Sequence, residues 1–211
     1  NGSRKAEAEV TIATADGNVV AEGKAGMDIK VPQQSLKLWT AETPYLYNMT
    51  VRLKLGNRIV QTYRRKIGIR EMAWKGGVLK VNGSPIMLKG VHHHDLSATH
   101  GRGLTEEVLQ KDIRIVKEGN INFVRCSHYP PQPRLLELCD SAGLYVLDEV
   151  PFGFGVKNLT DESFLPILID RARHTYMRDK NHPSVIAWSV GNENPLTEIC
   201  RETGRYMRDL D

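Results

Sequence analysis

The sequence predicts a multi-domain protein in which part of an all-β, immunoglobulin-like sandwich precedes a parallel α/β unit. Three observations predict this fold class. Up to about residue 71, short segments alternate apolar and polar residues with a period of two. From residue 72 onward, apolar strands alternate with helical segments. These later strands are continuous apolar runs, which are typical of sheets covered on both faces. We therefore expect one domain over residues 1–71 and a second over residues 72–211.

The first domain is expected to contain five strands separated by turn-forming residues. They cover residues 6–13, 19–25, 27–32, 45–55 and 59–71. A complete immunoglobulin-like sandwich uses about seven strands. We therefore expect its first strands to be missing from this chain.

The second domain is expected to contain four βα units after a hinge at "KGG", residues 75–77. Thr105 is the expected N-cap of the first helix, and Gly119 and Gly143 are expected to end the first two helices. The expected strands cover 86–92, 122–126, 144–149 and 184–192, and the helices about 105–118, 133–142, 162–179 and from 195 onward. Successive βα units predict parallel strands with right-handed crossovers, in either a doubly wound sheet or part of a (β/α)8 barrel.

Composition excludes several classes of protein. The net charge of +4 on 211 residues is spread thinly, so we expect no nucleic-acid partner. Membrane insertion is not expected, because no apolar run approaches the roughly 18 residues of a membrane span. The location stays open between cytoplasm and periplasm or exterior, with a bacterial source expected. The three cysteines form no CxxC pair and are expected to be small core residues.

Polar side chains collect at the carboxyl ends of the four expected strands, where parallel α/β folds bind their ligands. The opposite ends of these strands carry no charge. In chain order, the carboxyl ends carry His92, His93, His94 and Asp95; Arg125, Ser127 and His128; Asp148 and Glu149; and Asn192 and Glu193. A requirement for stability alone does not predict this asymmetry.

Several of these residues also have a structural interpretation. Glu193 can be an acid that stabilises the start of the following helix. Asp148 is expected to anchor Arg125 across adjacent strands rather than to react. The three histidines with Asp95 suggest a metal site, but strand alternation turns His93 away from its neighbours, so we expect no metal. His128 can simply close a turn.

Carboxylates, histidines, an arginine and an amide around one pocket, without a phosphate-binding loop, favour hydrolysis of a neutral polar substrate. Sugar acetals are the leading case, because they need a proton donor, an opposing carboxylate and hydrogen bonds to hydroxyl groups. A carboxyl in a dry pocket can supply the proton. Glu193 is the candidate for this role.

Four segments together resemble glycoside hydrolase family 2, which includes β-galactosidases, β-glucuronidases and β-mannosidases. They are "NGSPIMLKGVHHHD" (82–95), "INFVRCSHYP" (121–130), "GLYVLDE" (143–149) and "RDKNHPSVIAWSVGNEN" (178–194). The resemblance implies that the second domain is the first half of a (β/α)8 TIM barrel and that the enzyme retains configuration by double displacement.

The resemblance also implies residue roles. Glu193 would be the general acid/base, and Asn192 would bind the sugar 2-hydroxyl. His94, Asp95 and His128 are assigned to substrate binding, and Arg125, Asp148 and Glu149 to support of the site. No cofactor is expected. No magnesium is expected either, because residues 150–155 lack the Glu and His that bind it in well-known β-galactosidases of the family.

The resemblance further implies that the family's nucleophilic glutamate lies beyond Asp211 and that a sugar-binding domain precedes residue 1. We therefore expect the 211-residue chain alone not to hydrolyse aryl β-glycosides. The parent is expected to be a β-galactosidase acting on a carbohydrate β-glycoside, and a homo-oligomer is possible for it. β-Glucuronidase and β-mannosidase are the alternatives within the family, and a non-catalytic scaffold is the alternative outside it.

Overall fold

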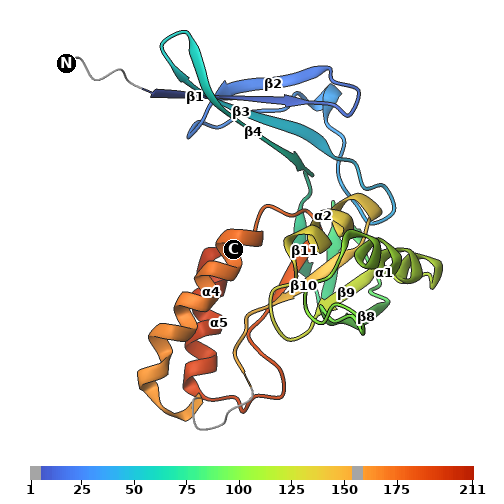
Figure 1. The fold of residues 1–211 in the computed structure, drawn as a ribbon, viewed down its shortest axis with the longest axis vertical. Helices are drawn as coiled ribbons and strands as arrows, with labels where there is room; N and C mark the ends of the chain where they lie inside the picture. Colours follow the sequence, from blue (N-terminus) through green and yellow to red (C-terminus); the bar gives the residue numbers. More distant parts are fainter. Residues whose placement is uncertain (1–5, 154–158) are drawn as a thin grey trace.

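The computed structural model describes residues 6–153 and 159–211. They form an antiparallel sheet and, beside it, a unit of parallel strands and helices (Figure 1). No helix among the described residues is long and apolar enough to cross a membrane. The fold is therefore built from two kinds of layer, as the change of period near residue 72 predicts.

The first sheet has the strand order β2-β1-β3-β4 and is antiparallel throughout. Its strands are β1 (Ala6–Ala13), β2 (Val19–Lys24), β3 (Tyr47–Leu55) and β4 (Arg58–Ile67). The strand predicted at 27–32 is wrong, because this segment has no regular structure and leads into a short 3-10 helix, Gln33–Ser35. No described strand lies beside it to take its backbone hydrogen bonds. Its apolar residues Ile29 and Val31 still pack on the sheet core of Val10, Ile12, Ala21 and Tyr47.

A small three-stranded sheet follows, formed by β5 (Met72–Lys75), β6 (Val78–Val81) and β7 (Ser84–Pro85). The segment interpreted as a hinge is the turn of its first hairpin. Gly76 and Gly77 have φ values of +62° and +77°, and Lys75 pairs with Val78. Positive φ at both central residues is the requirement of a type I′ turn, which glycine meets without steric cost.

The second unit contains a parallel sheet in the order β11-β10-β9-β8. Its strands are β8 (Gly90–His93), β9 (Phe123–Cys126), β10 (Tyr145–Glu149) and β11 (Val185–Ser189). β8 begins later than predicted, because the Ile86 N–H bonds Leu79 O of the preceding hairpin. Strands that are consecutive in the chain are neighbours throughout, as in a barrel segment, whereas a doubly wound sheet reverses its order.

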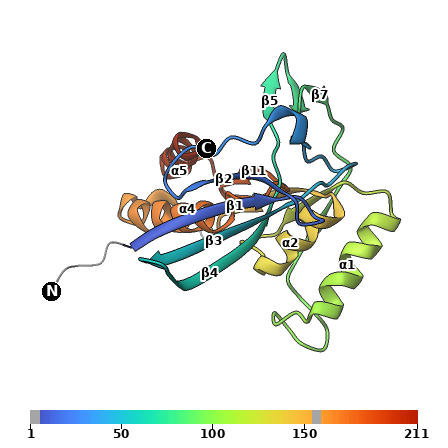
Figure 2. The same cartoon turned by 90° about the horizontal axis from the view of Figure 1, so that it is seen from above.

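Four helices that lie wholly within the described residues accompany these strands, and their ends lie within three residues of the predicted ones. They are α1 (Glu106–Glu118), α2 (Pro133–Ala142), α4 (Leu165–Asp179), which follows a short 3-10 helix at Glu162–Phe164, and α5 (Glu198–Leu210). Thr105 caps α1 by accepting the Val108 N–H, and Gly143 ends α2 at φ +71°. Two views place α1 with α2, and α4 with α5, as neighbouring pairs (Figures 1 and 2).

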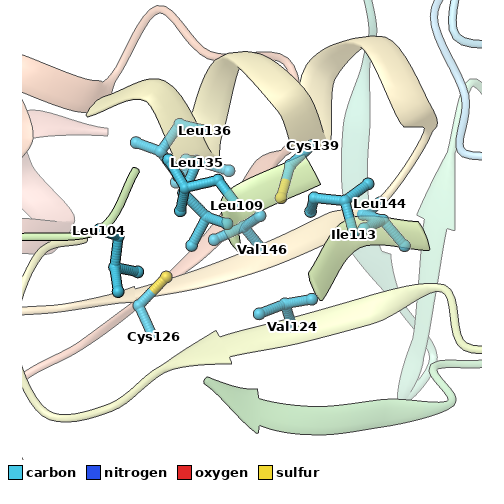
Figure 3. Close-up of a cluster of buried hydrophobic side chains, with 11 residues drawn as sticks. Leu104, Leu109, Ile113, Val124, Cys126, Leu135, Leu136, Cys139, Leu144 and Val146 are labelled. Carbon is cyan, nitrogen blue, oxygen red and sulfur yellow. The ribbon is translucent and has the colours of Figure 1, made fainter. Parts of the chain in front are cut away.

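The main core lies between the strands and the first two helices (Figure 3). It joins Leu109 and Ile113 of α1, Leu135, Leu136 and Cys139 of α2, and Val124, Cys126 and Val146 of the sheet. All three cysteines are buried and free, which confirms their prediction as small core residues. Burial raises the pKa of the Cys126 and Cys139 thiols, so both are neutral in the core.

The two units are joined by buried polar contacts at the amino-terminal end of the parallel strands. Trp39 Nε1 donates to Asp140 O at 2.8 Å, and the Asp140 carboxylate binds His182 Nδ1 at 2.6 Å and the Ser184 N–H at 3.0 Å. Arg70 donates from Nε to Pro183 O at 2.6 Å. Helix α2 is therefore held both to the first unit and to the segment that enters β11.

Replacement of Gly143 by Ala tests this junction. A Cβ at Gly143 would lie 2.1 Å from Ala41 O, whereas a Cβ at Gly17, where φ is also positive, would meet nothing within 4 Å. Both variants place a side chain in the left-handed region, at a cost of about 1–2 kcal/mol. We expect Gly143→Ala to lower the free energy of unfolding by about 2 kcal/mol more than Gly17→Ala, because it adds a backbone clash. Urea unfolding measures both, and equal losses would contradict the predicted clash.

Candidate active site

Strand alternation and register decide which side chains share the face of the parallel sheet that is turned away from α1 and α2. Residues paired in register on parallel strands point to the same face. Arg125 pairs with His92 of β8 and with Leu147 of β10, and Glu149 lies two residues after Leu147. Arg125 and Glu149 therefore share this face, whereas Val124 and Val146 point into the helix-covered core.

Arg125 is the centre of a hydrogen-bonded network on this face. Its Nε and Nη2 atoms donate to Glu149 Oε2 at 3.0 and 2.6 Å, and Nη2 also donates to Asn192 Oδ1 at 2.9 Å. The second oxygen of Glu149, Oε1, lies 3.0 Å from His128 Nδ1. The network thus joins three strand ends, those of β9, β10 and β11, and brings together four of the predicted site residues.

The expected pairing of Asp148 with Arg125 is wrong, because the arginine binds Glu149 instead. Successive side chains on a strand point to opposite faces. Asp148 therefore faces α4, where Asp179 lies close enough to raise the pKa of its carboxyl, after the larger effect of burial. Sequence reasoning placed both acids at the correct strand end but assigned the arginine to the wrong one.

His94 belongs to an aromatic cluster at the edge of the network. Its ring lies 5.1 Å from the His128 ring and 6.2 Å from the Tyr129 ring, and the Arg102 guanidinium lies 4.1 Å from the Tyr129 ring centroid. Desolvation lowers the pKa of His94, and the nearby His128 lowers it further. At neutral pH His94 is therefore an uncharged imidazole that can both donate and accept a hydrogen bond.

Glu193 lies on the loop after β11, and its two neighbours hold its backbone. Asn192 is bound by Arg125, and Asn194 Nδ2 donates to Gly153 O at 2.7 Å. Glu193 itself has φ +51°, in the sparsely populated left-handed region. Its side chain is exposed and makes no hydrogen bond or ion pair with any described residue. The described residues form no dry pocket around this acid, so the expectation of such a pocket stays a prediction, whereas Glu149 is buried, with 0% exposure.

Gly191 allows this loop to turn back on itself. Its φ is +137°, and a Cβ there would lie 2.2 Å from Asn194 Oδ1 and 3.1 Å from Phe152 Cβ. Glycine is therefore required by both the backbone conformation and the close approach of Asn194.

Asp95 lies outside the Arg125 network. It is buried, and its Oδ2 accepts the Gln132 N–H at 2.5 Å, just before α2. Its Oδ1 lies 3.5 Å from His93 Nδ1, while His93 Nε2 contacts Asp112 Oδ2 of α1 at 3.1 Å. His93 is thus turned toward the helices, as strand alternation predicts, and the part of Asp95 in substrate binding stays a prediction.

Within residues 6–153 and 159–211, no group of three or more His, Cys, Asp or Glu side chains is arranged to hold a metal ion. The expectation of no magnesium concerned residues 150–155, of which 154 and 155 lie outside the described residues. The absence of magnesium therefore stays a prediction.

Comparison with protein families identifies both units. Residues 72–211 match the TIM barrel domain of the glycosyl hydrolases family 2, and residues 1–70 match a second model of glycosyl hydrolases family 2. The chain belongs to glycosyl hydrolase family 2. This membership confirms the resemblance seen in the sequence and the predicted fold class, in which the family's β-domain precedes part of a TIM barrel.

Individual family 2 proteins resemble the chain over most of its length. It is 42% identical over 175 residues to a β-galactosidase of Lactococcus lactis, covering 80% of the chain and 18% of the relative. It is 36% identical over 209 residues to a β-galactosidase of Streptococcus thermophilus, covering 93% of the chain and 20% of the relative. The chain thus spans about a fifth of the length of these relatives.

Solved structures in the family show the same arrangement. A β-glucuronidase of Ruminococcus gnavus in complex with D-glucuronic acid matches with a TM-score of 0.88 and 32% identity, over 97% of this chain and 36% of that chain. A β-D-glucuronidase of Dictyoglomus thermophilum matches with a TM-score of 0.88 and 32% identity, over 99% and 38%. The described arrangement of β-domain and barrel strands is therefore that of family 2 enzymes.

Sequence reasoning missed three contributors to the site. Tyr129 follows the predicted His128 directly, and its ring lies beside that of His94. Asn194 holds the loop that carries Glu193. Asp179 is the buried partner of Asp148. Asn194 and Asp179 both lie within the "RDKNHPSVIAWSVGNEN" motif, but a motif alone does not show what each side chain contacts.

Proposed function

We propose that the protein carrying this chain is a retaining β-glycosidase that removes terminal β-linked galactose, with Glu193 as its general acid/base. One observation carries the proposal: Glu193 is exposed, pairs with no residue that the structure describes, and lies beside Asn192, which is held in the network of Arg125 and Glu149. An acid that must give and take a proton in each cycle has to be free of a permanent partner. The surrounding donors can then orient a sugar next to it.

In this mechanism a second carboxylate attacks the anomeric carbon, and the bond to the leaving-group oxygen breaks. Glu193 gives its proton to that oxygen and becomes a carboxylate. In the second step it takes a proton from the attacking water, and the bond between sugar and nucleophile breaks. Glu193 ends the cycle protonated, and the configuration at the anomeric carbon is retained.

The described residues supply the binding groups for this cycle. Asn192 keeps its Nδ2 amide for the sugar 2-hydroxyl, because its Oδ1 is occupied by Arg125. His94, uncharged at neutral pH, can bond a further hydroxyl as donor or acceptor. Glu149 is fully buried and bound on both oxygens, so its role is to support Arg125 and His128 rather than to react.

Galactose is the preferred sugar in the proposal because the sequence identity of the chain to the named β-galactosidases is higher than its sequence identity to the solved β-glucuronidases. The values are 42% and 36% against 32%. β-Glucuronide is the second candidate, supported by TM-scores of 0.88 over 97–99% of the chain.

A panel of chromogenic glycosides tests the substrate. The full-length protein that carries this chain is expected to cleave p-nitrophenyl β-D-galactoside with a kcat/KM at least about tenfold above that for the β-D-glucuronide and β-D-mannoside. A Glu193→Gln variant run on the same panel controls for contaminating activity. Faster cleavage of the glucuronide would overturn the choice of sugar, and cleavage of none would overturn the glycosidase proposal.

A further inference from the structure

Two carboxyl groups meet in the interior between β10 and α4. Asp148 lies near the end of β10 and Asp179 is the last residue of α4, and both have 0% exposure. The Asp179 carboxyl lies close enough to Asp148 to raise the pKa of its carboxyl, in addition to the effect of burial. The catalytic steps proposed above use neither carboxyl. Catalysis by these groups therefore does not account for their burial.

Within the described parts of the chain, Arg178 is the cation that contacts this pair. Arg178 Nε donates to Asp179 Oδ1 and Oδ2 at 2.8 and 2.9 Å, and Arg178 Nη2 donates to Asp179 Oδ2 at 2.6 Å and to Pro131 O at 2.8 Å. Arg178 therefore neutralises Asp179, and its donors are directed there and to Pro131. A second buried negative charge on Asp148 would lack compensation, which is costly in the interior.

The two oxygens of Asp148 have different surroundings. Oδ1 accepts the Glu149 N–H at 2.9 Å. Oδ2 is buried and receives a hydrogen bond from no group in the described ranges. Its neighbour is the Asp179 carboxylate, which can only accept. The contact is therefore repulsive unless one proton lies between the two carboxyl groups.

We propose that Asp148 is a positioning residue whose protonated carboxyl donates from Oδ2 to Asp179, tying β10 to α4 next to Glu149. The pair then holds one proton and one negative charge, and Arg178 balances that charge. Asp148 acts through Glu149, because Oδ1 holds the Glu149 backbone while the Glu149 side chain holds Arg125 and, through it, Asn192.

The charged and titratable groups facing Asp148 agree with this protonation. Burial raises the pKa of Asp148, and the hydrogen bond and charge of Asp179 raise it further, whereas Arg178 lowers it. Cys126 of β9 also faces the pair, and burial raises the pKa of its thiol. Cys126 is thus neutral and supplies no positive charge.

The direction of the pH dependence follows from linkage. The pKa of Asp148 is higher in the folded protein than the roughly 3.9 of an unfolded aspartate. Between these two values the folded state binds more protons than the unfolded state, so stability falls as pH rises. An asparagine at this position keeps the acceptor for the Glu149 N–H, supplies an amide donor to Asp179, and does not titrate.

The test compares Asp148→Asn, Asp148→Ala and the unchanged full-length protein that carries this chain. At pH 8 we expect Asp148→Asn to raise Tm by about 2–4 °C, with a smaller gain at pH 5. Infrared spectroscopy is expected to show a protonated-carboxyl C=O band that Asp148→Asn removes. The matched control is Asp140→Asn, a buried aspartate paired with His182, which should lower Tm at both pH values and leave the band in place.

The positioning role of Asp148 is tested by the kcat and KM of its variants, and this test rests on the proposed glycosidase function. Asp148→Ala is expected to lower kcat at least tenfold with a smaller change in KM, and Asp148→Asn is expected to restore most of that loss. A Tm for Asp148→Asn that is equal to or below the unchanged protein at pH 8, with the infrared band retained, would overturn the shared proton. If Tm and the band behave as expected but no glycoside is cleaved, the proposed function fails and the shared proton stands.

Discussion

Glu193→Gln, in the full-length protein that carries this chain, is expected to lower kcat on lactose by about 10²–10⁴-fold. The sugar leaving group of lactose is a poor one, so breaking its bond requires a proton from the enzyme. Glutamine has nearly the same shape as glutamate but cannot donate that proton or accept one from water. Because Glu193 is exposed and makes no hydrogen bond or ion pair with any described residue, the substitution removes no such contact within the part of the chain that the structure describes.

The choice of substrate separates the two steps of the cycle. An aryl galactoside with a good leaving group needs little protonation, so its first step should survive in Glu193→Gln while the second step is slow. Added azide, a nucleophile that needs no general base, should then restore turnover and give a β-galactosyl azide. Kinetics with lactose and aryl galactosides, with and without azide, measure this pattern.

Glu202→Gln is the matched control for this prediction. Glu202 lies on α5 with its side chain 44% exposed and pairs with Arg205. Surface pairs contribute about 0–1 kcal/mol, so kcat should stay within about twofold of the unchanged protein. A Glu193→Gln variant with normal kcat on lactose would show that another group is the acid/base.

Arg125→Ala is expected to lower the free energy of unfolding by about 3–5 kcal/mol, the cost of removing one partner of a buried ion pair. Glu149 has 0% exposure and receives two hydrogen bonds from Arg125. Without the arginine, the buried Glu149 carboxylate keeps the contact with His128 Nδ1 at 3.0 Å but has lost its guanidinium partner. Asn192 also loses the donor that holds it next to Glu193.

Denaturant unfolding measures this loss, with Arg134→Ala as the control. Arg134 makes hydrogen bonds to Glu106 and Glu137, but its side chain is 42% exposed. Its removal is therefore expected to cost less than about 1 kcal/mol. Addition of Glu149→Gln to Arg125→Ala should recover part of the stability, because it removes the uncompensated charge. Equal losses for the two arginine variants would contradict the importance of the buried pair.

Much of the fold could be predicted because many of its helix and strand ends depend on residues that are close together in the sequence. The helix ends at Thr105 and Gly143 were predicted from capping chemistry, which involves only a few neighbouring residues. The strand predicted at 27–32 failed because a strand also needs a partner, and the pattern of a segment does not say whether a partner lies beside it. The "KGG" hinge failed for a related reason, since two glycines permit both a flexible link and a tight turn.

The site likewise has one part that the sequence predicted and another that depends on the register of the strands. Composition at the strand ends placed Arg125, His128, Glu149, Asn192 and Glu193 at one edge, because parallel strands bring their carboxyl ends together. Register then decided what each side chain meets: Arg125 binds Glu149 rather than Asp148, although the two acids are adjacent in the chain. A shift of one residue on a strand reverses the face of a side chain, and motif matching does not resolve that shift.

The sequence by itself determined the family, the order of strands and helices, and the set of polar residues at the barrel edge. These properties depend on residue types and their spacing along the chain. The tertiary structure alone decided that Glu193 is exposed, that Glu149 is buried, and that Asp148 lies close to Asp179. Burial and pairing are properties of groups brought together from distant parts of the chain, and their free energies depend on distance and surroundings rather than on sequence position.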